Sequence, residues 1–250
     1  MATRAERASS FGTVAADYDR LRPGPPDAAL RWLLPTGCVT AVDLAAGTGL
    51  VSRAVVPLVR TLVAIEPDPR MAAVLRARSA GAAVVRGLGE AIPLADASVD
   101  AVLISSAWHW LDPAAAVPEL ARVLRDGGRL CVLRSGIDWE TGWPRKLRRP
   151  EHPGREEQRR DMSGRYRALP TTGQFGIAAR ESFTFARSMT AAEFTALLAT
   201  YSGVITASER DRAADLDRVR SELDRLFPGG GAIEVPMRTR CWRADRVGRR

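Results

Sequence analysis

Apolar and polar positions in the first half of the chain follow two alternating patterns. Short, almost continuous apolar runs are typical of strands buried on both faces of a sheet. They occur at 39–44, 61–66, 82–87, 99–106 and 129–135. Segments with the apolar spacing of helices lie around and between them, at 27–34, 49–59, 67–79 and 113–125. We expect Gly127 and Gly128 to end the last of these helices.

This alternation predicts an α/β protein with a doubly wound, parallel sheet. The pattern stops at residues 138–181, which are rich in Arg, Gly and Pro, and we interpret them as a lid or insertion. Regular patterning then returns. It predicts a strand at 181–188, helices at 190–202 and 209–227, and a last strand at 232–247 that pairs antiparallel with its neighbour.

The overall length and composition fit this picture. The 250 residues are enough for one large α/β domain or two small ones. No apolar run is long enough to span a membrane, and the N-terminus lacks a signal-peptide core, so we expect a cytoplasmic protein. The three cysteines and two histidines (Cys38, Cys131, Cys241, His109 and His152) have no metal-ligand spacing, so we expect neither a metal nor disulfides.

The net charge of +8 raises the question of nucleic-acid binding. Lys146 is the only lysine, and arginines gather at 145–150 and 155–160. No aromatic residues alternate with these arginines, as they do in channels that stack nucleic-acid bases. We therefore interpret the clusters as a solvated insertion and regard nucleic acid as an unfavoured partner.

The stretch AVDLAAGTGLVSR, residues 41–53, has the composition of a nucleotide-binding turn. It follows the first predicted strand, and ligands of open α/β sheets bind beyond the carboxyl ends of strands. Gly47 and Gly49 allow a tight turn whose backbone can approach a ligand closely. The helix that begins near Gly49 offers unpaired N–H groups.

Three kinds of nucleotide ligand are compatible with a glycine turn of this type. A phosphate-binding loop needs Lys and Ser or Thr after its glycines, but Leu50 and Val51 stand there. A dinucleotide site needs a third glycine, but Ser52 stands there, and Asp43 would repel a pyrophosphate. S-adenosylmethionine carries an ammonium and a sulfonium and no phosphate, so Asp43 suits it best.

A second acid, Glu66, ends the second predicted strand about 20 residues after the glycines, a spacing at which an acid reaches ribose hydroxyls. On its own this spacing does not separate a nicotinamide dinucleotide from S-adenosylmethionine. The alternative interpretations are a turn aspartate at 43 and an exposed strand-end acid at 66. The presence of both acids at strand ends favours the methyl donor.

Six segments in the correct order make the chain resemble the class I S-adenosylmethionine-dependent methyltransferases. Its features are most similar to the small-molecule enzymes of ubiquinone and menaquinone biosynthesis and to trans-aconitate methyltransferases. The matching segments are FGTVAADYDRLRPGPP (11–26), VDLAAGTG (42–49), VAIEPDPRM (63–71), GLGEAIPLADASVDAVL (87–103), SSAWHWLD (105–112) and ELARVLRDGGRL (119–130). Three departures are Pro25 in place of an aromatic residue, Gly89 in place of alanine and Asp126 in place of proline.

The resemblance implies S-adenosyl-L-methionine as cofactor, with S-adenosyl-L-homocysteine as product. It implies that Glu66 binds the ribose, that Met71 lies beside the adenine and that Tyr18 bonds the carboxylate side of the donor. Arg22 is expected near the donor or the acceptor, although ordinary surface placement would explain Tyr18 and Arg22 as well. The full set implied for the cofactor is Tyr18, Arg22, Asp43, Ala45, Gly47, Thr48, Gly49, Glu66, Pro67, Met71, Gly89, Glu90 and Ser106.

His109, just after the fourth predicted strand, is the candidate catalytic residue. Its imidazole could take a proton from the acceptor; alternatively it orients donor or substrate, or it packs between Trp108 and Trp110. Trp108 and Trp110 are also expected to form an apolar wall beside the sulfonium, although core packing would explain Trp110 as well. Trp139 and Trp143 flank the insertion, where they could line an acceptor pocket or simply pack in a turn.

We therefore expect one methyltransferase domain over 1–250, with a seven-stranded, mostly parallel, Rossmann-like sheet whose last strand is antiparallel. Its parts are an N-terminal cover segment (1–35), a donor-binding core (36–136), a lid or insertion (137–181) and a C-terminal, substrate-side part (182–250). The expected reaction is methyl transfer to a small-molecule acceptor by in-line displacement. The alternatives are an RNA methyltransferase, a donor-binding protein without methyl transfer or with another reaction, and a nicotinamide oxidoreductase. The sequence does not indicate the oligomeric state.

Overall fold

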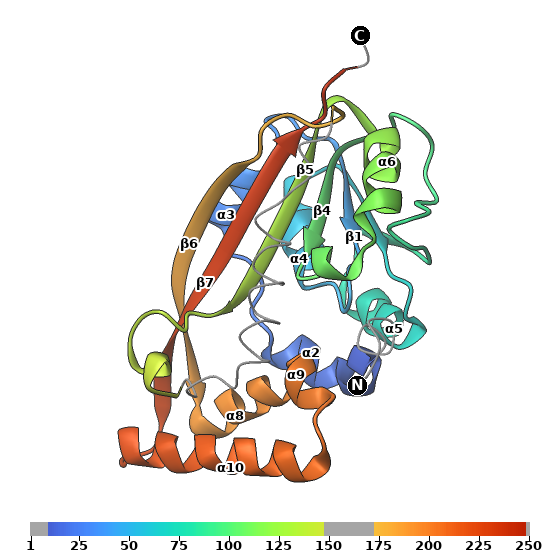
Figure 1. Ribbon diagram of the computed structural model, residues 1–250. Helices are drawn as coiled ribbons and strands as arrows, with labels where there is room; N and C mark the ends of the chain where they lie inside the picture. Colours follow the sequence, from blue (N-terminus) through green and yellow to red (C-terminus); the bar gives the residue numbers. More distant parts are fainter. Residues whose placement is uncertain (1–9, 148–172, 249–250) are drawn as a thin grey trace.

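A computed structural model describes residues 10–147 and 173–248 of the chain (Figure 1). Its seven strands form one sheet in the order β3-β2-β1-β4-β5-β7-β6. The strands are β1 (Thr40–Leu44), β2 (Thr61–Ile65), β3 (Ala82–Val85), β4 (Val99–Ser105), β5 (Leu124–Ile137), β6 (Ala179–Thr190) and β7 (Ala232–Asp245). The expected seven-stranded fold is confirmed.

Strand β7 is the one strand of this sheet that runs against its neighbours. Strands β1 to β5 pair in parallel, whereas β7 pairs antiparallel with both β5 and β6. The last strand in sequence is therefore inserted between β5 and β6, and the prediction that it is antiparallel is confirmed.

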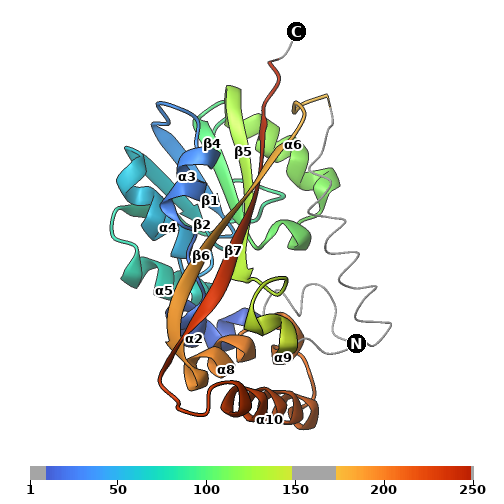
Figure 2. The ribbon, with the colours of Figure 1, turned by 90° about the vertical axis from the view of Figure 1, so that its left-hand side faces the viewer.

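Helices cover both faces of the sheet (Figure 2). The helices α3 (Asp27–Leu33), α4 (Leu50–Val55) and α5 (Pro69–Arg78) lie on one face, and α6 (Pro113–Val123) lies on the other. Short 3₁₀ segments and the remaining helices are η1 (Ser10–Val14), α2 (Ala15–Leu21), η2 (Val56–Leu58), η3 (Trp108–Trp110), η4 (Trp143–Leu147), α8 (Ala191–Ala199), α9 (Ser202–Ile205) and α10 (Glu209–Leu226).

Local sequence signals set several helix starts. Asp68 and Asp112 each cap a helix with a side-chain oxygen and are followed by proline at the first helical position. Thr190 and Glu193 form a reciprocal capping box at the start of α8. These signals explain why the sequence pattern placed the starts of α5, α6 and α8 closely.

Two apolar layers hold the helices against the sheet. On the α6 face, α6 residues pack on alternate residues of β1, β4, β5 and β7, including Val42, Val102 and Trp242. On the other face, α3 and α4 pack on the intervening residues, including Ala41, Leu103 and Cys131. Cys131 and Cys241 are buried as expected, whereas Cys38 is half-buried, and all three thiols are free.

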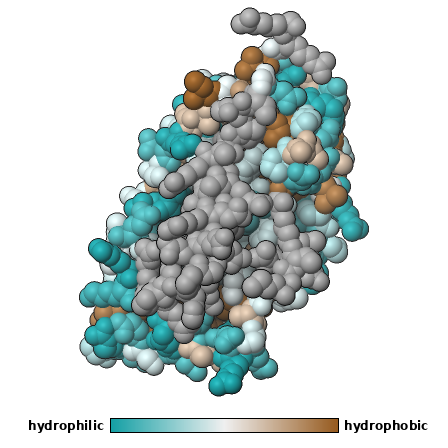
Figure 3. Space-filling model, in the orientation of Figure 1, coloured by the Kyte–Doolittle hydropathy of each residue, from teal (hydrophilic) through white to brown (hydrophobic). Residues whose placement is uncertain are grey.

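A third apolar cluster lies where β5, β6 and β7 extend beyond the parallel strands. It joins the ends of these strands to α8, α10 and the last turn of α2, with Phe194, Leu223 and Leu21 among its buried members. Figure 1 shows α2, α8 and α10 gathered at this lower end of the sheet. The face of α10 turned to solvent makes the lower part of the surface mostly hydrophilic (Figure 3).

Two predicted elements differ from the structure. The helix expected over 113–125 ends at Val123, and Gly127 and Gly128 lie inside β5. The reason is pairing with the segment that follows β7, since Gly127 N donates to Arg246 O and Arg246 N donates to Gly128 O. The helix expected over 190–202 ends at Ala199, and the short helix α9, which the sequence pattern did not predict, follows after Tyr201 in extended conformation.

The segment interpreted as a lid or insertion is described only at its two ends. Residues 138–147 pack onto the third cluster through η4, and β6 begins at Ala179, three residues before the expected boundary at 182. Most of the arginine clusters at 145–150 and 155–160 lies outside the described residues.

Gly49 is the position where backbone and packing both exclude a side chain. Its φ is +86°, in the left-handed region, and a Cβ there would lie 2.4 Å from Leu75 Cδ1 and 2.3 Å from Ser79 Oγ, side-chain atoms at the end of α5. The glycine therefore allows α5 to approach the start of α4 closely.

We predict that Gly49→Ala destabilises the fold by about 2–4 kcal/mol, because backbone strain and overpacking add together. The matched control is Gly37→Ala, since Gly37 also has a positive φ (+73°) but no heavy atom lies within 4 Å of its Cβ position. The control should cost about 1 kcal/mol. If urea denaturation shows the same loss of unfolding free energy for both variants, the close approach of α5 to α4 does not require Gly49.

Candidate functional site

The candidate site lies at the carboxyl ends of β1, β2 and β4. The sheet order places the topological switch point between β1 and β4, where open α/β sheets bind ligands. Ala45 and Ser106, which follow these two strands, have φ angles of +55° and +54°. Left-handed conformations at residues other than glycine are uncommon and gather at functional sites. Their occurrence at two neighbouring strand ends therefore indicates a ligand site.

The Asp43 carboxyl group is buried beneath the turn that follows β1. Its side chain is 0% exposed, and Ser52 Oγ donates a hydrogen bond of 2.6 Å to Oδ2. Oδ1 has no hydrogen-bond partner among the described residues. Burial raises the pKa of Asp43 to about 7; the charge of Glu66 adds to the rise, and the Ser52 hydrogen bond opposes it. This carboxyl group is consequently poised to ionise near neutral pH.

Glu66 connects the end of β2 to the glycine turn. Gly47 N donates 2.8 Å to Oε2, and Asp68 N donates 2.9 Å to Oε1. Burial raises the pKa of Glu66, while these two backbone N–H groups oppose the rise. The glutamate therefore fixes the shape of the turn, a function that the sequence did not suggest.

A second buried polar atom without a partner accompanies Asp43 Oδ1. Thr48 is 1% exposed, and its hydroxyl has no hydrogen-bond partner in the part of the chain that the structure describes. Buried polar atoms are nearly always hydrogen-bonded, so each such exception points to a ligand, a water molecule or a strained position. Two of them in six residues, at a glycine turn, indicate a polar ligand.

The predicted N-terminal cover is held to the core by one buried carboxylate. Asp19 of α2 is 8% exposed and accepts from Arg53 of α4 at 2.7 Å and from Arg78 of α5 at 3.2 Å. Arg53 also donates to Thr48 O, within the glycine turn. The cover and the turn are thus joined through one arginine.

A continuous series of ring contacts runs along the cover, from the end of β4 toward α9. His109 contacts Trp110 (centroids 4.3 Å apart), Trp110 contacts Phe11 (6.2 Å), and Phe11 contacts Tyr18 (5.8 Å). The Arg22 guanidinium lies 5.0 Å from the Tyr18 ring and 3.8 Å from the Tyr201 ring. We call this series, His109, Trp110, Phe11, Tyr18, Arg22 and Tyr201, the ring ladder.

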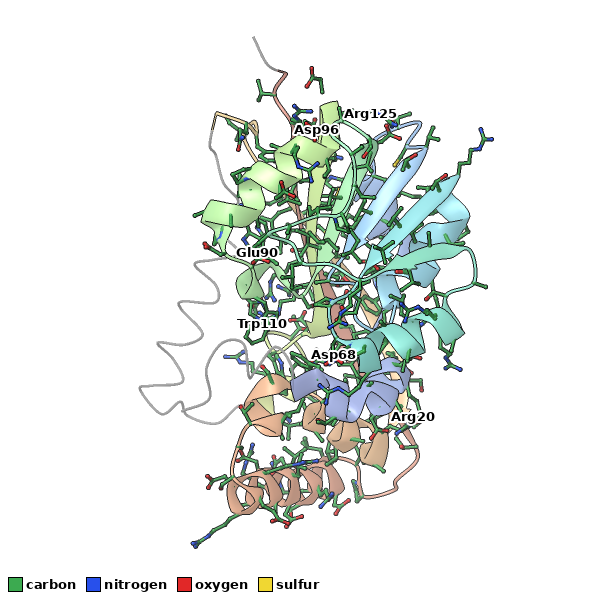
Figure 4. All side chains as sticks on the ribbon, turned by 90° about the vertical axis from the view of Figure 1, so that its right-hand side faces the viewer. Arg20, Asp68, Glu90, Asp96, Trp110 and Arg125 are labelled. Carbon is green, nitrogen blue, oxygen red and sulfur yellow. The ribbon has the colours of Figure 1, made fainter. Side chains whose placement is uncertain are left out.

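The middle of the ring ladder lies close to the two acids. Burial raises the pKa of Tyr18, the cation of Arg22 opposes the rise, and Tyr201, Glu66 and Asp43 each add to it. In Figure 4, Asp68 and Trp110 lie above α2 at one end of the sheet, whereas Asp96 and Arg125 lie at the opposite end. The cover and the carboxyl ends of the strands therefore face one another.

The remaining residues implied for the cofactor are spread over the same edge and beyond it. Met71 is buried, and its Cε would lie 3.4 Å from a Cβ at Gly47. Pro67 is half-buried in the turn between Glu66 and Asp68. Gly89 is buried, and a Cβ there would lie 2.6 Å from Leu111 Cδ2, which explains glycine in place of alanine.

Glu90 is engaged in the fold, since its Oε1 accepts a 2.8 Å hydrogen bond from Asp112 N at the start of α6. Among the predicted substrate residues, Trp108 is 3% exposed and belongs to the core under α6, which disfavours it as a wall of an open site. Trp143 donates to Glu234 O and packs against Phe194 and Phe227.

Trp139 also packs against the third apolar cluster. Both insertion tryptophans therefore hold the C-terminal helices, and the structure does not bring them together with His109.

Sequence reasoning missed Phe11, Asp19 and Tyr201. Asp19 stands in a sequence of alternating charges that is typical of an exposed helix, and only the fold turns it toward Arg53 and Arg78. Tyr201 lies far from Arg22 in sequence and carries no motif. Phe11 begins the segment FGTVAADYD but had no partner to suggest its contact.

Other kinds of site are not evident in the described residues. They contain no group of three or more His, Cys, Asp or Glu side chains that could hold a metal ion. No helix among them is both long and apolar enough to span a membrane. A cavity of about 370 Å³, lined in part by Arg180, Arg240 and Trp242, lies on the outer strands β6 and β7. Strands β4 and β5 separate it from β1.

Comparison with known proteins gives consistent results. A family described as the methyltransferase domain matches residues 42–132. A protein of Mycobacterium tuberculosis, described as an uncharacterised methyltransferase, is 38% identical over 245 residues, which cover 97% of this chain and 98% of the relative.

Solved structures share the fold at lower identity. A candidate type II methyltransferase from Anaeromyxobacter dehalogenans is 22% identical, with a TM-score of 0.69, covering 91% of this chain and 99% of that one. A phosphoethanolamine N-methyltransferase of Haemonchus contortus, in complex with S-adenosyl-L-methionine, is 14% identical, with a TM-score of 0.51, covering 95% of this chain and 57% of that one.

We predict that Asp19→Asn loosens the cover. The substitution removes the charge that Arg53 and Arg78 share. Because these arginines are 29% and 62% exposed, the cost should exceed the roughly 0–1 kcal/mol of an exposed pair but stay below the roughly 3–5 kcal/mol of a fully buried one. Faster hydrogen exchange over residues 11–21, measured by mass spectrometry, should accompany a loss of stability.

The matched control is Asp17→Asn on the same helix. Asp17 pairs with Arg20 in an exposed ion pair, in which the side chains are 60% and 56% exposed. Such pairs contribute about 0–1 kcal/mol, so exchange of the cover should stay unchanged. If hydrogen exchange over residues 11–21 is equally fast in the two variants, Asp19 does not anchor the cover.

Proposed function

The chain belongs to the class I S-adenosylmethionine-dependent methyltransferases, and from this premise we propose that it methylates a small-molecule acceptor with a donor held at the carboxyl ends of β1 and β2. As a member of this family the protein is an enzyme that transfers a methyl group. The proposal adds the place of the donor, the residues that hold it and the kind of acceptor.

The observation that supports the donor site is the pair of unsatisfied polar atoms beneath the glycine turn. Asp43 Oδ1 and Thr48 Oγ1 are buried acceptors without described partners, and the donor's ammonium group can supply hydrogen bonds to such atoms. Asp43 ionised opposite a cation would regain the charge interaction that burial removes. The residues present therefore fit S-adenosylmethionine and not a pyrophosphate.

Glu66 completes the donor site in this proposal. Each of its oxygens already accepts one backbone N–H and has capacity for a further hydrogen bond, which ribose hydroxyls would provide. Met71 is buried against the turn and would contribute apolar contact to the base. Tyr18, held by Arg22 and Phe11, would close the donor from the side of the cover.

The chemistry of methyl transfer asks little of the protein beyond alignment. The bound donor supplies an activated methyl group on a sulfonium, and the acceptor displaces it in line. The residues of this chain orient the two reactants and exclude water. Orientation raises the rate through proximity, and the exclusion of water leaves a preorganised environment around the methyl group. The ring ladder provides apolar surface at the edge from which an acceptor would approach.

His109 has a place in this scheme at the end of the ring ladder. It lies in η3 directly after β4 and contacts the Trp110 ring. We assign it to the acceptor side, where an imidazole can accept a proton from an acceptor that must lose one or can orient the acceptor by a hydrogen bond. His109→Ala should leave donor binding unchanged and lower turnover; unchanged turnover would remove the residue from the scheme.

A small molecule is favoured over RNA by the use that the structure makes of its arginines. Arg53, Arg122 and Arg238 each bind carboxylates of the fold, and Arg122 binds both Asp96 and Glu119. Charges that are paired within the protein are poorly placed to neutralise phosphates. These three arginines therefore serve the fold and are not a phosphate-binding surface.

We predict that donor affinity rises with pH between 6 and 7.5. Below its pKa of about 7 the Asp43 carboxyl group is protonated in the free protein and must lose the proton to bind an ammonium group. Each pH unit below that pKa then costs about tenfold in affinity. Isothermal titration with S-adenosylmethionine at a series of pH values measures this slope.

Asp43→Asn is the control for this pH dependence. The variant keeps the shape of the side chain, should bind the donor about tenfold or more weakly at pH 7.5 and should lose the slope. A slope that persists in the variant would assign the titration to another group, such as His109.

The acceptor class can be tested by following the label from S-adenosylmethionine that carries a radioactive methyl group. We predict that label enters the small-molecule fraction of a bacterial extract and not its RNA. The rate should depend only weakly on salt, because RNA binding weakens steeply as salt rises and small-molecule binding does not. Label in RNA, with a steep salt dependence, would replace the small-molecule assignment; donor binding without any labelled product would contradict both acceptor classes.

A further inference from the structure

The ring ladder ends at a tyrosine hydroxyl that has no partner. Tyr201 OH is buried and makes no hydrogen bond to any described group. The residue caps the start of α9 in extended conformation, between α8 and α9, so its ring position is set by two helices. Because a buried phenol usually finds a hydrogen-bond partner, an unpartnered one indicates a place for a ligand.

The hydroxyl points to a place where the chain has no side chain. A Cβ added at Gly136 would lie 3.4 Å from Tyr201 OH, and apart from its two chain neighbours no other described residue comes within 4 Å of that Cβ position. Strand β4 ends at Ser105, opposite Leu133, so Gly136 lies three residues, or about 10 Å, beyond the edge of β4. The unpartnered hydroxyl is therefore buried against the Gly136 backbone just beyond the carboxyl edge of the sheet, at a point where β5 turns no side chain toward it.

Arg22 fixes the Tyr201 ring and brings a positive charge to it. The guanidinium lies 3.8 Å from the centroid of the ring, and its Nε and Nη2 donate to Thr200 Oγ1 and O at 2.9 and 3.0 Å. A guanidinium has five N–H donors, so these two bonds leave further donors next to the phenol. An anionic group placed there would gain charge-assisted hydrogen bonds.

The Tyr201 hydroxyl and the Arg22 guanidinium also lie on the side of the donor turn that the cover faces, from which we expect an acceptor to approach. Helix α9 packs against η1 of the cover, and Figure 1 shows α9 beside α2 below the parallel strands. The Arg22 guanidinium lies 5.0 Å from the Tyr18 ring and 3.8 Å from the Tyr201 ring, and Tyr18, whose pKa is raised chiefly by burial, is also within electrostatic reach of Asp43 and Glu66. In space, the groups therefore follow one another from the donor turn through Tyr18 and Arg22 to Tyr201.

Resting on the proposed methyl transfer, we propose that Tyr201 binds the acceptor through its hydroxyl and that Arg22 selects an acceptor with an anionic oxygen, a carboxylate or a phenolate, at that place. Tyr201 is thus a specificity-determining residue, and Thr200 positions it through Arg22. The two rival roles for the buried hydroxyl are a contact with the donor itself and a purely structural one.

The three tyrosines of the chain make a direct test practicable. The full-length protein is labelled with 3-fluorotyrosine, and its ¹⁹F signals are assigned with Tyr→Phe variants. The protein is saturated with S-adenosylhomocysteine and titrated with benzoate, benzamide and benzylamine, which share a ring and differ in charge. We expect benzoate to move the Tyr201 signal saturably, and the two other compounds to move it at least tenfold less effectively.

Each different result overturns the assignment. A Tyr201 signal that moves on addition of S-adenosylhomocysteine and then responds to none of the three compounds makes the residue a donor contact. A signal that never moves makes it structural. Equal effects of benzamide or benzylamine contradict the selection of an anion by Arg22. Loss of S-adenosylhomocysteine binding by the unmodified protein is a separate result, which counts against the proposed function.

Substitution gives an independent readout. Tyr201→Phe should bind S-adenosylmethionine within about twofold of the wild type and benzoate about tenfold more weakly, as loss of a hydrogen bond to a charged group predicts. Ser135→Ala is the matched control, because it removes a buried hydroxyl next to Gly136 that pairs with Thr239 at 2.8 Å. The control should leave benzoate affinity unchanged.

Gly136→Ala keeps the test informative if Tyr201→Phe fails to fold. The added Cβ would lie 3.4 Å from the hydroxyl that binds the anion and away from the donor turn, so benzoate binding should weaken while donor binding is retained. Unchanged benzoate affinity in both Tyr201→Phe and Gly136→Ala would place benzoate elsewhere and end the assignment.

Discussion

The burial of the Asp43 carboxyl group beneath the glycine turn is the constraint on which the rest of the site depends. A carboxyl group with one unsatisfied oxygen is costly in a protein interior, and the Ser52 hydroxyl satisfies only the other oxygen. A close-packed turn is needed to keep water from reaching it, and that turn is possible because Gly49 lets α5 approach α4. Burial of this carboxyl group destabilises the free protein. The same burial favours the binding of a cation, because a positive ligand restores the favourable charge interaction that the carboxylate loses when it is removed from water.

The cover is coupled to this turn through charge and not through apolar contact alone. Asp19 accepts from Arg53 and Arg78, and Arg53 also donates to the Thr48 carbonyl group in the turn. At its other end α2 is joined to the outer sheet, because Arg187 of β6 donates to the carbonyl groups of Leu21 and Arg20. The N-terminal segment therefore connects the donor turn with the C-terminal part of the sheet through one short helix.

The sequence predicted the parallel half of the sheet and its helices well because the information for these elements is local. The apolar runs, the Asp-Pro helix starts at 68 and 112, and the glycine turn each act over fewer than about ten residues, within the reach of periodicity and capping rules. The predicted end of α6 was wrong for a non-local reason, because Gly127 and Gly128 form backbone hydrogen bonds with Arg246, which is distant in sequence. Trp139 and Trp143 were candidates for the acceptor, but the packing of η4 on α8 and α10 places them in the third cluster. No pattern in residues 138–147 could have indicated which helices would cover them.

The acceptor side is assembled from residues that sequence reasoning cannot bring together. Arg22 bonds Thr200 across 178 positions, and Tyr201 reaches Gly136 from the turn between α8 and α9, where periodicity had predicted continuous helix as far as residue 202. The long strands β5 and β7 make this possible, because they continue past the ends of β1 and β4 and carry α8 and α9 to the open edge. The donor turn can thus stay constant in shape while the strand extensions and α9 set what approaches it. Arg22 belongs to the cover, and Tyr201 lies between α8 and α9. The placement of the cover and the choice of acceptor therefore both depend on the contact between the Arg22 guanidinium and the Tyr201 ring.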